Sequence, residues 1–221
     1  MNGTHQVMLH FQDVGGKNMK QIDIEVVDNF LSPRYFNRIK NTVLSNKHPW
    51  YSLQAITGAY DESTDSMVSG DLQSYGFYFF VVEEENVQFE HPLSYMLTGF
   101  LHQAQDYCGR ENIVRSRFDM VTRSSETKYQ HDAHVDISPY RPNIITAIFY
   151  LTDSDAETVI FNEKQKPSDG EKSVWNSSEL TVKERIMPKE NRILFFDGHY
   201  IHTGYSPVNF KHRILLNSNF A

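Results

Sequence analysis

The spacing of apolar and polar residues in the first part of the chain predicts a strand followed by a helix. The stretch 22–27, IDIEVV, alternates apolar and polar side chains, which is typical of a strand with one buried face. After it, Phe36 and Ile39 begin an apolar stripe with helical spacing. Ser32 is the expected N-cap of this helix, and Pro33 takes its first position, where a backbone N–H is not needed.

A loop, a second strand and a second helix follow. The stretch 55–74 is rich in Gly, Ser, Asp and Thr, so we expect a long loop of the kind that often contacts a ligand. The apolar run 75–82 predicts a strand, and 91–109 predicts a helix with one apolar stripe. Residues 1–20 have no clear period and predict a flexible arm or an added edge strand. We expect 21–111 to form a layer of strands and helices that supports the rest of the chain.

From about residue 112 the pattern changes to short apolar runs separated by turn residues, and no helical spacing returns. Such closely spaced strands predict a sandwich or barrel rather than a parallel sheet with crossover helices. The expected strands are 113–122, 134–137, 143–153, 157–163, 183–188, 191–198, 200–206 and 212–220.

Composition narrows the class of protein. A chain of 221 residues, 39% of them hydrophobic, can bury one sizeable core, so we expect a single globular domain. Cys108 is the only cysteine, which excludes an internal disulfide and a cysteine-based zinc site and fits a cytoplasmic setting. We see no signal peptide or membrane-spanning run and expect a soluble protein. A net charge of −7 makes nucleic acid a poor candidate partner.

Candidate chemistry is concentrated in QHDAHVDISPY, residues 130–140. His134 and Asp136 are two residues apart, so on a strand they face the same side. A third donor is available from His202 in FFDGHYIHTGYSP. Two histidines and one carboxylate on one face of an octahedron leave the opposite positions open, as in non-haem Fe(II) oxygenases. Isolated His-x-Asp pairs are common, however, and a polar loop without a metal is the alternative.

Arg213 follows His202 by eleven residues and precedes an apolar strand segment. A guanidinium holds a carboxylate by a planar two-point contact, so Arg213 either grips the far carboxylate of 2-oxoglutarate or makes a surface ion pair. Three other histidines compete for the metal role. His131 and His199 each lie three residues before a favoured histidine and would point to the other side of a strand, so we expect both at the rim or in packing. His212 adjoins Arg213 and should face away from it, while a site based on His131 and Asp132 stays open as the less consistent alternative.

The His-x-Asp pair, the second histidine with FDGHYIHTGYSP around it, and Arg213 together resemble the Fe(II)/2-oxoglutarate-dependent dioxygenases, specifically the prolyl-4-hydroxylase-like branch. The resemblance covers 112–221, and DNFLSP, beginning at Asp28, is similar to the opening of that branch. It implies a mainly β fold, a cupin-like double-stranded β-helix or jelly roll over 112–221, with supporting N-terminal α-helices in a single domain 1–221.

The resemblance also implies the residues of a 2-oxoglutarate pocket. TAIFYLTD is similar to the family segment T-x-I-x-Y-L-N, so Thr146 and Tyr150 are expected to line that pocket, with ordinary packing as the alternative. ETVIF resembles the family turn G-G-E-T-x-F, but Asp155 and Ala156 replace both glycines, which puts any role of the threonine in doubt. Leu215 stands where the family often has a hydroxyl, so Tyr150 or Thr146 must supply that hydrogen bond.

The activity implied by the resemblance is hydroxylation of an unactivated C–H bond, with a peptidyl prolyl or similar side chain as the candidate substrate group and with release of succinate and CO2. Fe(II) would be held by His134, Asp136 and His202, with 2-oxoglutarate and O2 as co-substrates and ascorbate as a further candidate reductant. The presence of Asp136 favours hydroxylation over halogenation. The partner would be a peptide or a small molecule, and a homo-oligomer stays open. Two other functions stay open: a non-catalytic jelly-roll module that binds a metal or ligand, and a cupin-type metal oxygenase that does not use 2-oxoglutarate.

Overall fold

The structure is a computed structural model that describes residues 20–57, 59–61, 66–68, 73–83, 86–87 and 92–221. The arm or edge strand expected over 1–20 therefore lies outside the described residues, apart from Lys20. The elements before residue 112 are β1 (Ile24–Val27), α1 (Pro33–Val43), β2 (Tyr51–Leu53), β3 (Ala59–Asp61), β4 (Ser66–Val68), β5 (Gly76–Glu83), β6 (Asn86–Val87) and α2 (Pro92–Cys108). Those after it are β7 (Ile113–Thr122), β8 (Ala133–His134), β9 (Ile145–Tyr150), β10 (Thr158–Lys164), β11 (Val174–Trp175), β12 (Val182–Ile186), β13 (Arg192–Asp197), β14 (Tyr200–Gly204) and β15 (His212–Phe220).

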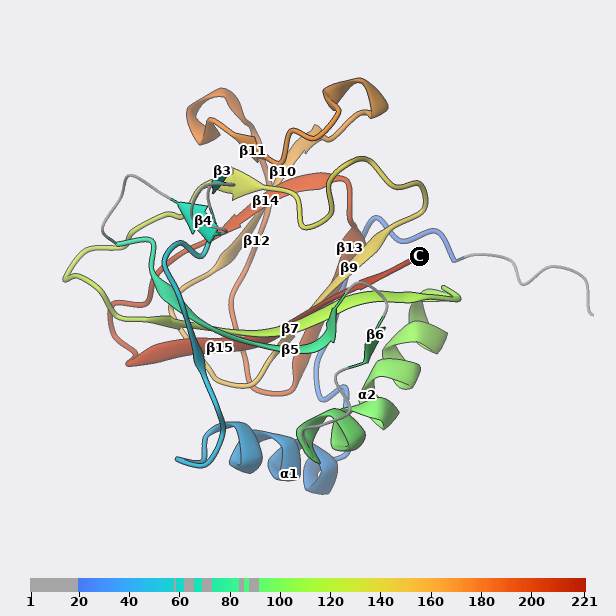
Figure 1. Ribbon diagram of the computed structural model, residues 1–221, viewed down its shortest axis with the longest axis vertical. Coiled ribbons are helices and arrows are strands. Elements are labelled where there is room, and N and C mark those ends of the chain that lie inside the picture. The colour runs from blue at the N-terminus through green and yellow to red at the C-terminus, as the bar shows by residue number, and fades with distance from the viewer. Residues whose placement is uncertain (1–19, 58, 62–65, 69–72, 84–85, 88–91) are drawn as a thin grey trace, which may run out of the picture.

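Two antiparallel sheets form the body of the protein (Figure 1). The larger sheet has the order β1-β13-β9-β15-β7-β5-β2, with β6 on β5, and the smaller has the order β11-β8-β14-β10-β12. Strands distant in sequence are neighbours in both sheets, as in a jelly roll. The predicted mainly β, jelly-roll fold with N-terminal helices is confirmed. Neither helix in the described part of the chain is long and apolar enough to cross a membrane.

Strict alternation of side chains divides the core into two layers. On β9, Ala147 and Phe149 face the helices α1 and α2, which cover the outer face of the larger sheet (Figure 1). Ile148 and Tyr150, the residues between and after them, face the smaller sheet. Phe149 is fully buried, and its ring centroid lies 4.8 Å from that of Phe100 on α2. This inner layer between the sheets is where inward polar residues of β7, β9 and β15 meet.

Several element boundaries differ from those expected. The long strands 113–122 and 212–220 have the predicted bounds, and Ser32 is the N-cap of α1, although its side chain makes no capping hydrogen bond. The stretch 55–74 contains the paired strands β3 and β4, so it is not a loop throughout. The strand expected over 134–137 is wrong in extent, because β8 ends at His134. His134 pairs with His202 on one side and Val174 on the other, and Ala133 pairs with Trp175.

Candidate metal centre

The structure brings His134, Asp136 and His202 into one cluster. His134 on β8 pairs directly with His202 on β14, and their ring centroids lie 4.5 Å apart. Asp136 follows the end of β8 and turns its carboxylate toward both rings: Oδ1 is 3.8 Å from His134 Nε2, and Oδ2 is 3.6 Å from His202 Nε2. All three donor atoms lie within 4.8 Å of one another. The cluster therefore depends on cross-strand pairing and on a turn, not on one extended strand carrying both members of the His-x-Asp pair.

Backbone carbonyls orient both imidazole rings. His134 Nδ1 lies 3.0 Å from the carbonyl oxygen of Asp132, and His202 Nδ1 lies 3.0 Å from that of Tyr200. A carbonyl only accepts, so each Nδ1 carries the proton and donates, which leaves the Nε2 lone pairs free. Such outer partners fix the tautomer and direction of a ligating histidine. Both free lone pairs point at the space beside Asp136.

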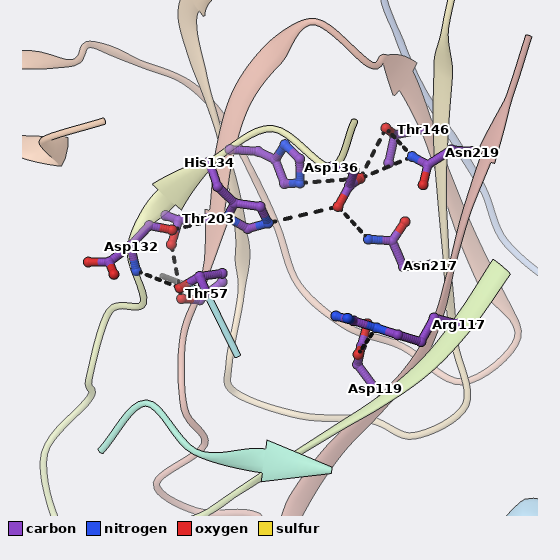
Figure 2. A network of polar contacts seen from close by, with 12 residues as sticks. Thr57, Arg117, Asp119, Asp132, His134, Asp136, Thr146, Thr203, Asn217 and Asn219 are labelled. Atoms are coloured by element: carbon purple, nitrogen blue, oxygen red, sulfur yellow. Dashed lines mark hydrogen bonds and ion pairs between the residues drawn. The ribbon is translucent and has the colours of Figure 1, made fainter. Parts of the chain in front are cut away.

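Three side chains that the sequence did not assign to the metal centre hold the Asp136 carboxylate (Figure 2). Asn217 Nδ2 donates to Oδ1 at 2.7 Å, and Asn219 Nδ2 donates to Oδ2 at 3.2 Å. Thr146 Oγ1 also donates to Oδ2 at 3.2 Å, so this residue lies at the carboxylate ligand. The expected role of Thr146 toward 2-oxoglutarate stays a prediction, while the two asparagines are additions to the site.

The protonation states suit metal binding. Burial, assisted by the neighbouring His202, lowers the pKa of His134 to about 4, so its imidazole is neutral near pH 7. Burial alone would raise the pKa of Asp136, but His202 and then Arg115 hold that pKa well below its usual range. Because metal ligands must be neutral imidazoles and ionised carboxylates, no proton has to leave these two groups before a cation binds.

We expect Asn217→Ala to weaken Fe(II) binding by roughly 10- to 100-fold, the usual effect of losing a group that orients a metal ligand. The substitution removes the 2.7 Å hydrogen bond to Asp136 without touching the three donor atoms. Competition with a coloured chelator measures the affinity. Asn162→Ala, at an exposed position of β10, is the control and should bind as the wild type does. Equal affinities in the two variants would contradict the orienting role.

Arg213 lies in the interior and makes no carboxylate contact. The residue is 5% exposed, and its Nη2 donates to Thr158 Oγ1 at 2.6 Å. The same hydroxyl is 2.7 Å from Tyr150 Oη. Thr158, whose role the sequence left in doubt, thus links Tyr150 to Arg213, while Leu215 adds only an apolar surface. Arg213 thus contacts the Thr158 hydroxyl directly. Asp155 and Ala156, which replace the two glycines of the family turn, do not prevent this contact.

The surroundings of Arg213 suit an anionic ligand. Its Nε is buried without a hydrogen-bond partner, and no carboxylate in the described part of the chain lies within ion-pairing distance of the guanidinium. Burial lowers the pKa of this arginine, yet a guanidinium keeps its charge at neutral pH. A buried, unpaired cation is costly. The residue types here, two imidazoles and a carboxylate near a guanidinium that no described carboxylate pairs, fit Fe(II) and a dicarboxylic acid bound together.

Gly204 makes room for the arginine. A Cβ at this position would lie 2.6 Å from Arg213 Nη1, closer than real contacts allow. We expect Gly204→Ala to displace the guanidinium and weaken 2-oxoglutarate binding by roughly 10- to 100-fold, about the value of a charged hydrogen bond. Calorimetry of the Fe(II)-loaded protein measures this. Fe(II) affinity, measured in the same variant, should not change, and a parallel loss of both affinities would contradict the assignment.

Two spaces meet at the metal centre. The first, called here the Arg213 cavity, has a volume of about 60 Å³ and includes His202, Thr158 and Arg213 in its wall. The second, called here the Arg115 cleft, has a volume of about 240 Å³ and includes Arg115, Ser138 and Ser173. The residues that line both spaces are Ile56, Thr57, Arg117, His134 and Asp136. The start of the stretch 55–74 therefore does contribute to the site.

The competing histidines lie outside the cluster. His131 is buried, and its Nε2 lies 3.1 Å from Ser206 Oγ. His199 is held by Asp197 Oδ1 at 2.7 Å and by the Arg141 carbonyl at 2.9 Å. In the described part of the chain, the cluster of candidate ligands has three members and no fourth. This leaves coordination positions for non-protein ligands, which a purely structural metal site would not need.

Comparisons with known proteins give structural matches alone. No protein-family model matches this chain, and no curated sequence matches it. An oxidoreductase of the 2OG-Fe(II) oxygenase family from Burkholderia pseudomallei is 12% identical and covers 89% of this chain and 84% of its own, with a TM-score of 0.57. A Pseudomonas putida prolyl-4-hydroxylase is 9% identical over 90% of this chain and 92% of its own, with a TM-score of 0.54. The epimerase SnoN, solved with Fe3+, alpha ketoglutarate and nogalamycin RO, is 10% identical over 90% and 78%, with a TM-score of 0.56. The chain thus has the fold of the 2-oxoglutarate-Fe(II) oxygenases.

Proposed function

We propose that this chain is an Fe(II)- and 2-oxoglutarate-dependent dioxygenase. The observation that carries the proposal is that the candidate ligands and the unpaired Arg213 line one cavity. Two histidines and a carboxylate with open positions suit Fe(II) in an oxygenase. A buried guanidinium in the same cavity suits the far carboxylate of 2-oxoglutarate. The shared fold with oxygenases of this class supports the proposal.

Each polar residue has a distinct task in this proposal. His134, Asp136 and His202 hold the iron, while Arg213 holds the far carboxylate of 2-oxoglutarate and so fixes the direction in which the co-substrate lies. Iron and 2-oxoglutarate, when bound, supply the activation of O2, with release of succinate and CO2. Thr158 keeps the guanidinium in place through its 2.6 Å hydrogen bond.

The apolar wall of the Arg213 cavity has a task of its own. Val121, Ile148 and Leu215 line it between the polar residues. Apolar side chains keep bulk water and stray reductants away from a reactive centre and strengthen the contact between a guanidinium and a carboxylate. The position of Leu215 next to Arg213 on β15 is therefore compatible with co-substrate binding, with Thr158 as the hydroxyl that accompanies the arginine.

Tyr150 and Thr146 lie at opposite ends of this site. Tyr150 is fully buried beside Arg213, whose guanidinium carbon is 5.8 Å from its ring centroid. It acts in the 2-oxoglutarate pocket through the hydroxyl of Thr158. Thr146 acts at Asp136 as a positioning residue and reaches the co-substrate only at its metal-bound end. They are four positions apart on β9, roughly 13 Å along a strand.

The reaction proposed is hydroxylation of an unactivated C–H bond in a peptide side chain or small molecule. Asp136 occupies the carboxylate position, and its three hydrogen bonds keep it ionised and directed at the cluster. The likeness in fold to a prolyl-4-hydroxylase makes prolyl peptides one substrate class to test, and a small-molecule enzyme such as SnoN makes free metabolites another. Ascorbate is a candidate reductant.

An anaerobic spectroscopic titration tests the proposal. Fe(II) and 2-oxoglutarate are added to the purified protein, and the visible metal-to-ligand charge-transfer band is recorded, with each component alone as a blank. We expect a band in the wild type, no band in His134→Ala, and a weaker band in Arg213→Ala. Subsequent exposure to O2 should give succinate in amounts that follow the band.

Two other results would replace the proposal. A band that is absent from metal-loaded wild-type protein would favour a binding module without oxygenase activity. Turnover of a substrate with O2 that needs the metal but neither 2-oxoglutarate nor Arg213 would favour a cupin-type oxygenase.

A further inference from the structure

Two arginines on β7 lie beside the metal centre without belonging to it. Arg115 and Arg117 are alternate residues, so both project from the same face of the strand, and both line the Arg115 cleft together with His134 and Asp136. Figure 2 shows Arg117 on its strand across from the Asp136 network. The ring centroid of Phe80 on β5 is 5.9 Å from the Arg115 guanidinium carbon and 5.7 Å from that of Arg117. The Phe80 ring thus lies beside both cations and contributes to holding them.

Each arginine has a carboxylate nearby, but the one beside Arg115 is a candidate metal ligand. Arg115 Nη1 lies 3.8 Å from Oδ1 of Asp136, a candidate metal ligand, and Arg117 Nε lies 2.7 Å from Asp119 Oδ1. Glu83 also acts on Arg115, but it is exposed and has the smallest of the resolved effects on the pKa of that arginine. Among the described residues, Arg115 therefore shares its nearest carboxylate with the candidate metal centre and has none of its own within ion-pairing distance.

The charged residues that line the two spaces have a net positive charge. Among the described residues that line the two spaces, the cations are Arg115, Arg117 and Arg213, and the anions are Asp119 and Asp136. These lining residues thus carry one positive charge more than negative ones, since ligating histidines are neutral. A divalent metal increases this excess by two, and a doubly charged 2-oxoglutarate removes two. One positive charge is left, in a buried space where an uncompensated charge is costly.

Ser138 supplies a polar atom that also lacks a partner. Its Oγ is buried and makes no hydrogen bond within the described part of the chain, and the residue lines the Arg115 cleft. Buried hydroxyls are normally hydrogen-bonded. The cleft, at about 240 Å³, is smaller than the roughly 300–1,000 Å³ typical of pockets for drug-sized ligands. Its ligand is therefore small and offers an acceptor.

We propose that the Arg115 cleft binds a small anionic substrate, whose carboxylate or phosphate group is held by Arg115 and Arg117 with Ser138 as a further donor. This rests on the proposed function, since the cleft meets the Arg213 cavity at His134 and Asp136. A guanidinium pair selects for an oxyanion by charge and by its forked donors. The neutral side chain of a prolyl peptide does not provide that charge.

Fragment probes test the proposal without knowledge of the whole substrate. Propionate, inorganic phosphate and neutral propionamide are titrated anaerobically into protein saturated with Fe(II) and 2-oxoglutarate, and binding is read from a shift of the visible band and by calorimetry. We expect propionate or phosphate to bind and propionamide to bind roughly 10- to 100-fold more weakly. The comparison of propionate with phosphate identifies the oxyanion.

Variants assign the binding to the cleft. Arg117→Gln should reduce anion affinity by roughly 10- to 100-fold, measured at saturating 2-oxoglutarate. Arg117→Lys keeps the charge but loses the fork, so it should give an intermediate affinity and serves if the glutamine variant does not fold. Arg38→Gln, at an exposed position on α1, is the matched control and should bind as the wild type does.

Three results would overturn the inference. These are equal binding of propionamide and propionate, unchanged anion affinity in Arg117→Gln, and loss of the band in that variant, which would assign the arginine to 2-oxoglutarate. If wild-type protein gives no band, the proposed function fails by itself. Calorimetric titration of the metal-free protein with the same three probes and variants then decides whether the anion site exists.

Discussion

His202→Ala is expected to lose bound iron, the visible band with 2-oxoglutarate and succinate formation together. Removing a ligand should weaken Fe(II) binding by more than the factor of about 100 that marks the loss of an orienting partner. His202 is 3% exposed, and its Nε2 lies 3.6 Å from the Asp136 carboxylate. The cluster of candidate ligands has no fourth member among the described residues, so no other side chain can take its place as a ligand. Metal content after gel filtration, the anaerobic band and succinate release measure the three losses.

His199→Ala is the matched control. It removes a histidine three residues away whose ring is engaged by Asp197 and by the Arg141 carbonyl. This variant should keep its iron and its band, although it can lose some stability. Stoichiometric iron in His202→Ala, combined with lost iron in His199→Ala, would move the metal centre to the other histidine. Circular dichroism checks that both variants are folded.

Phe149→Ala should lower the free energy of unfolding by about 3–5 kcal/mol, the usual range for a phenylalanine removed from a close-packed core. Phe149 is fully buried on β9, with ring centroids 4.8 Å from Phe100 on α2 and 6.0 Å from Phe36 on α1. It joins the larger sheet to both helices, so the cavity left by the ring cannot collapse easily. Urea unfolding followed by fluorescence measures the change.

Phe210→Ala is the control for this change, because it removes the same side chain from a position that is 41% exposed. Its effect should stay within about 0.5 kcal/mol, as for most surface substitutions. A loss of less than 1 kcal/mol in Phe149→Ala would show that the helices contribute little to the stability of the sheet. The metal centre lies on the other face of β9, so iron binding by folded Phe149→Ala should be unchanged.

Long strands were predictable from the sequence because the alternation of their side chains extends over enough residues to be recognised. Residues 113–122 and 212–220 alternate between the helix layer and the interior over nine or more positions, and their bounds agree with β7 and β15. The strands β8 and β11 have two residues each, too few to show a period. They form because cross-strand partners are already in place, which is a tertiary effect that no local pattern records.

The candidate site was predictable only in part, for a related reason. His134, Asp136 and His202 were chosen by residue type and order, and the fold brings them together. Asn217 and Asn219 were missed because an amide pair on a strand matches no ligand pattern. The alternation of side chains on the strand did contain this information. Both asparagines lie an even number of residues after Arg213 and so face the same side as it does, and polar residues at these positions indicate a polar interior.

Thr158 was doubted because two glycines expected before it are absent. In the structure the Asp155 carboxylate accepts hydrogen bonds from the backbone of Val208 and of Asn209, at 3.1 and 2.9 Å. A side chain thus fastens the connection between β14 and β15 to the start of β10. A comparison with the family motif cannot predict these hydrogen bonds, because Val208 and Asn209 lie far from the motif in the sequence.

The direct pairing of His134 with His202 across two strands has a consequence for how the candidate centre would take up a metal. Because the backbone ladder and two carbonyl acceptors already hold the rings, their separation is established when the sheet folds. The entropy cost of ordering the two histidine rings thus arises when the chain folds and not when a metal ion binds. Such a site can be emptied by a chelator and refilled, or given a spectroscopically silent divalent ion in place of iron, while the chain keeps its native structure.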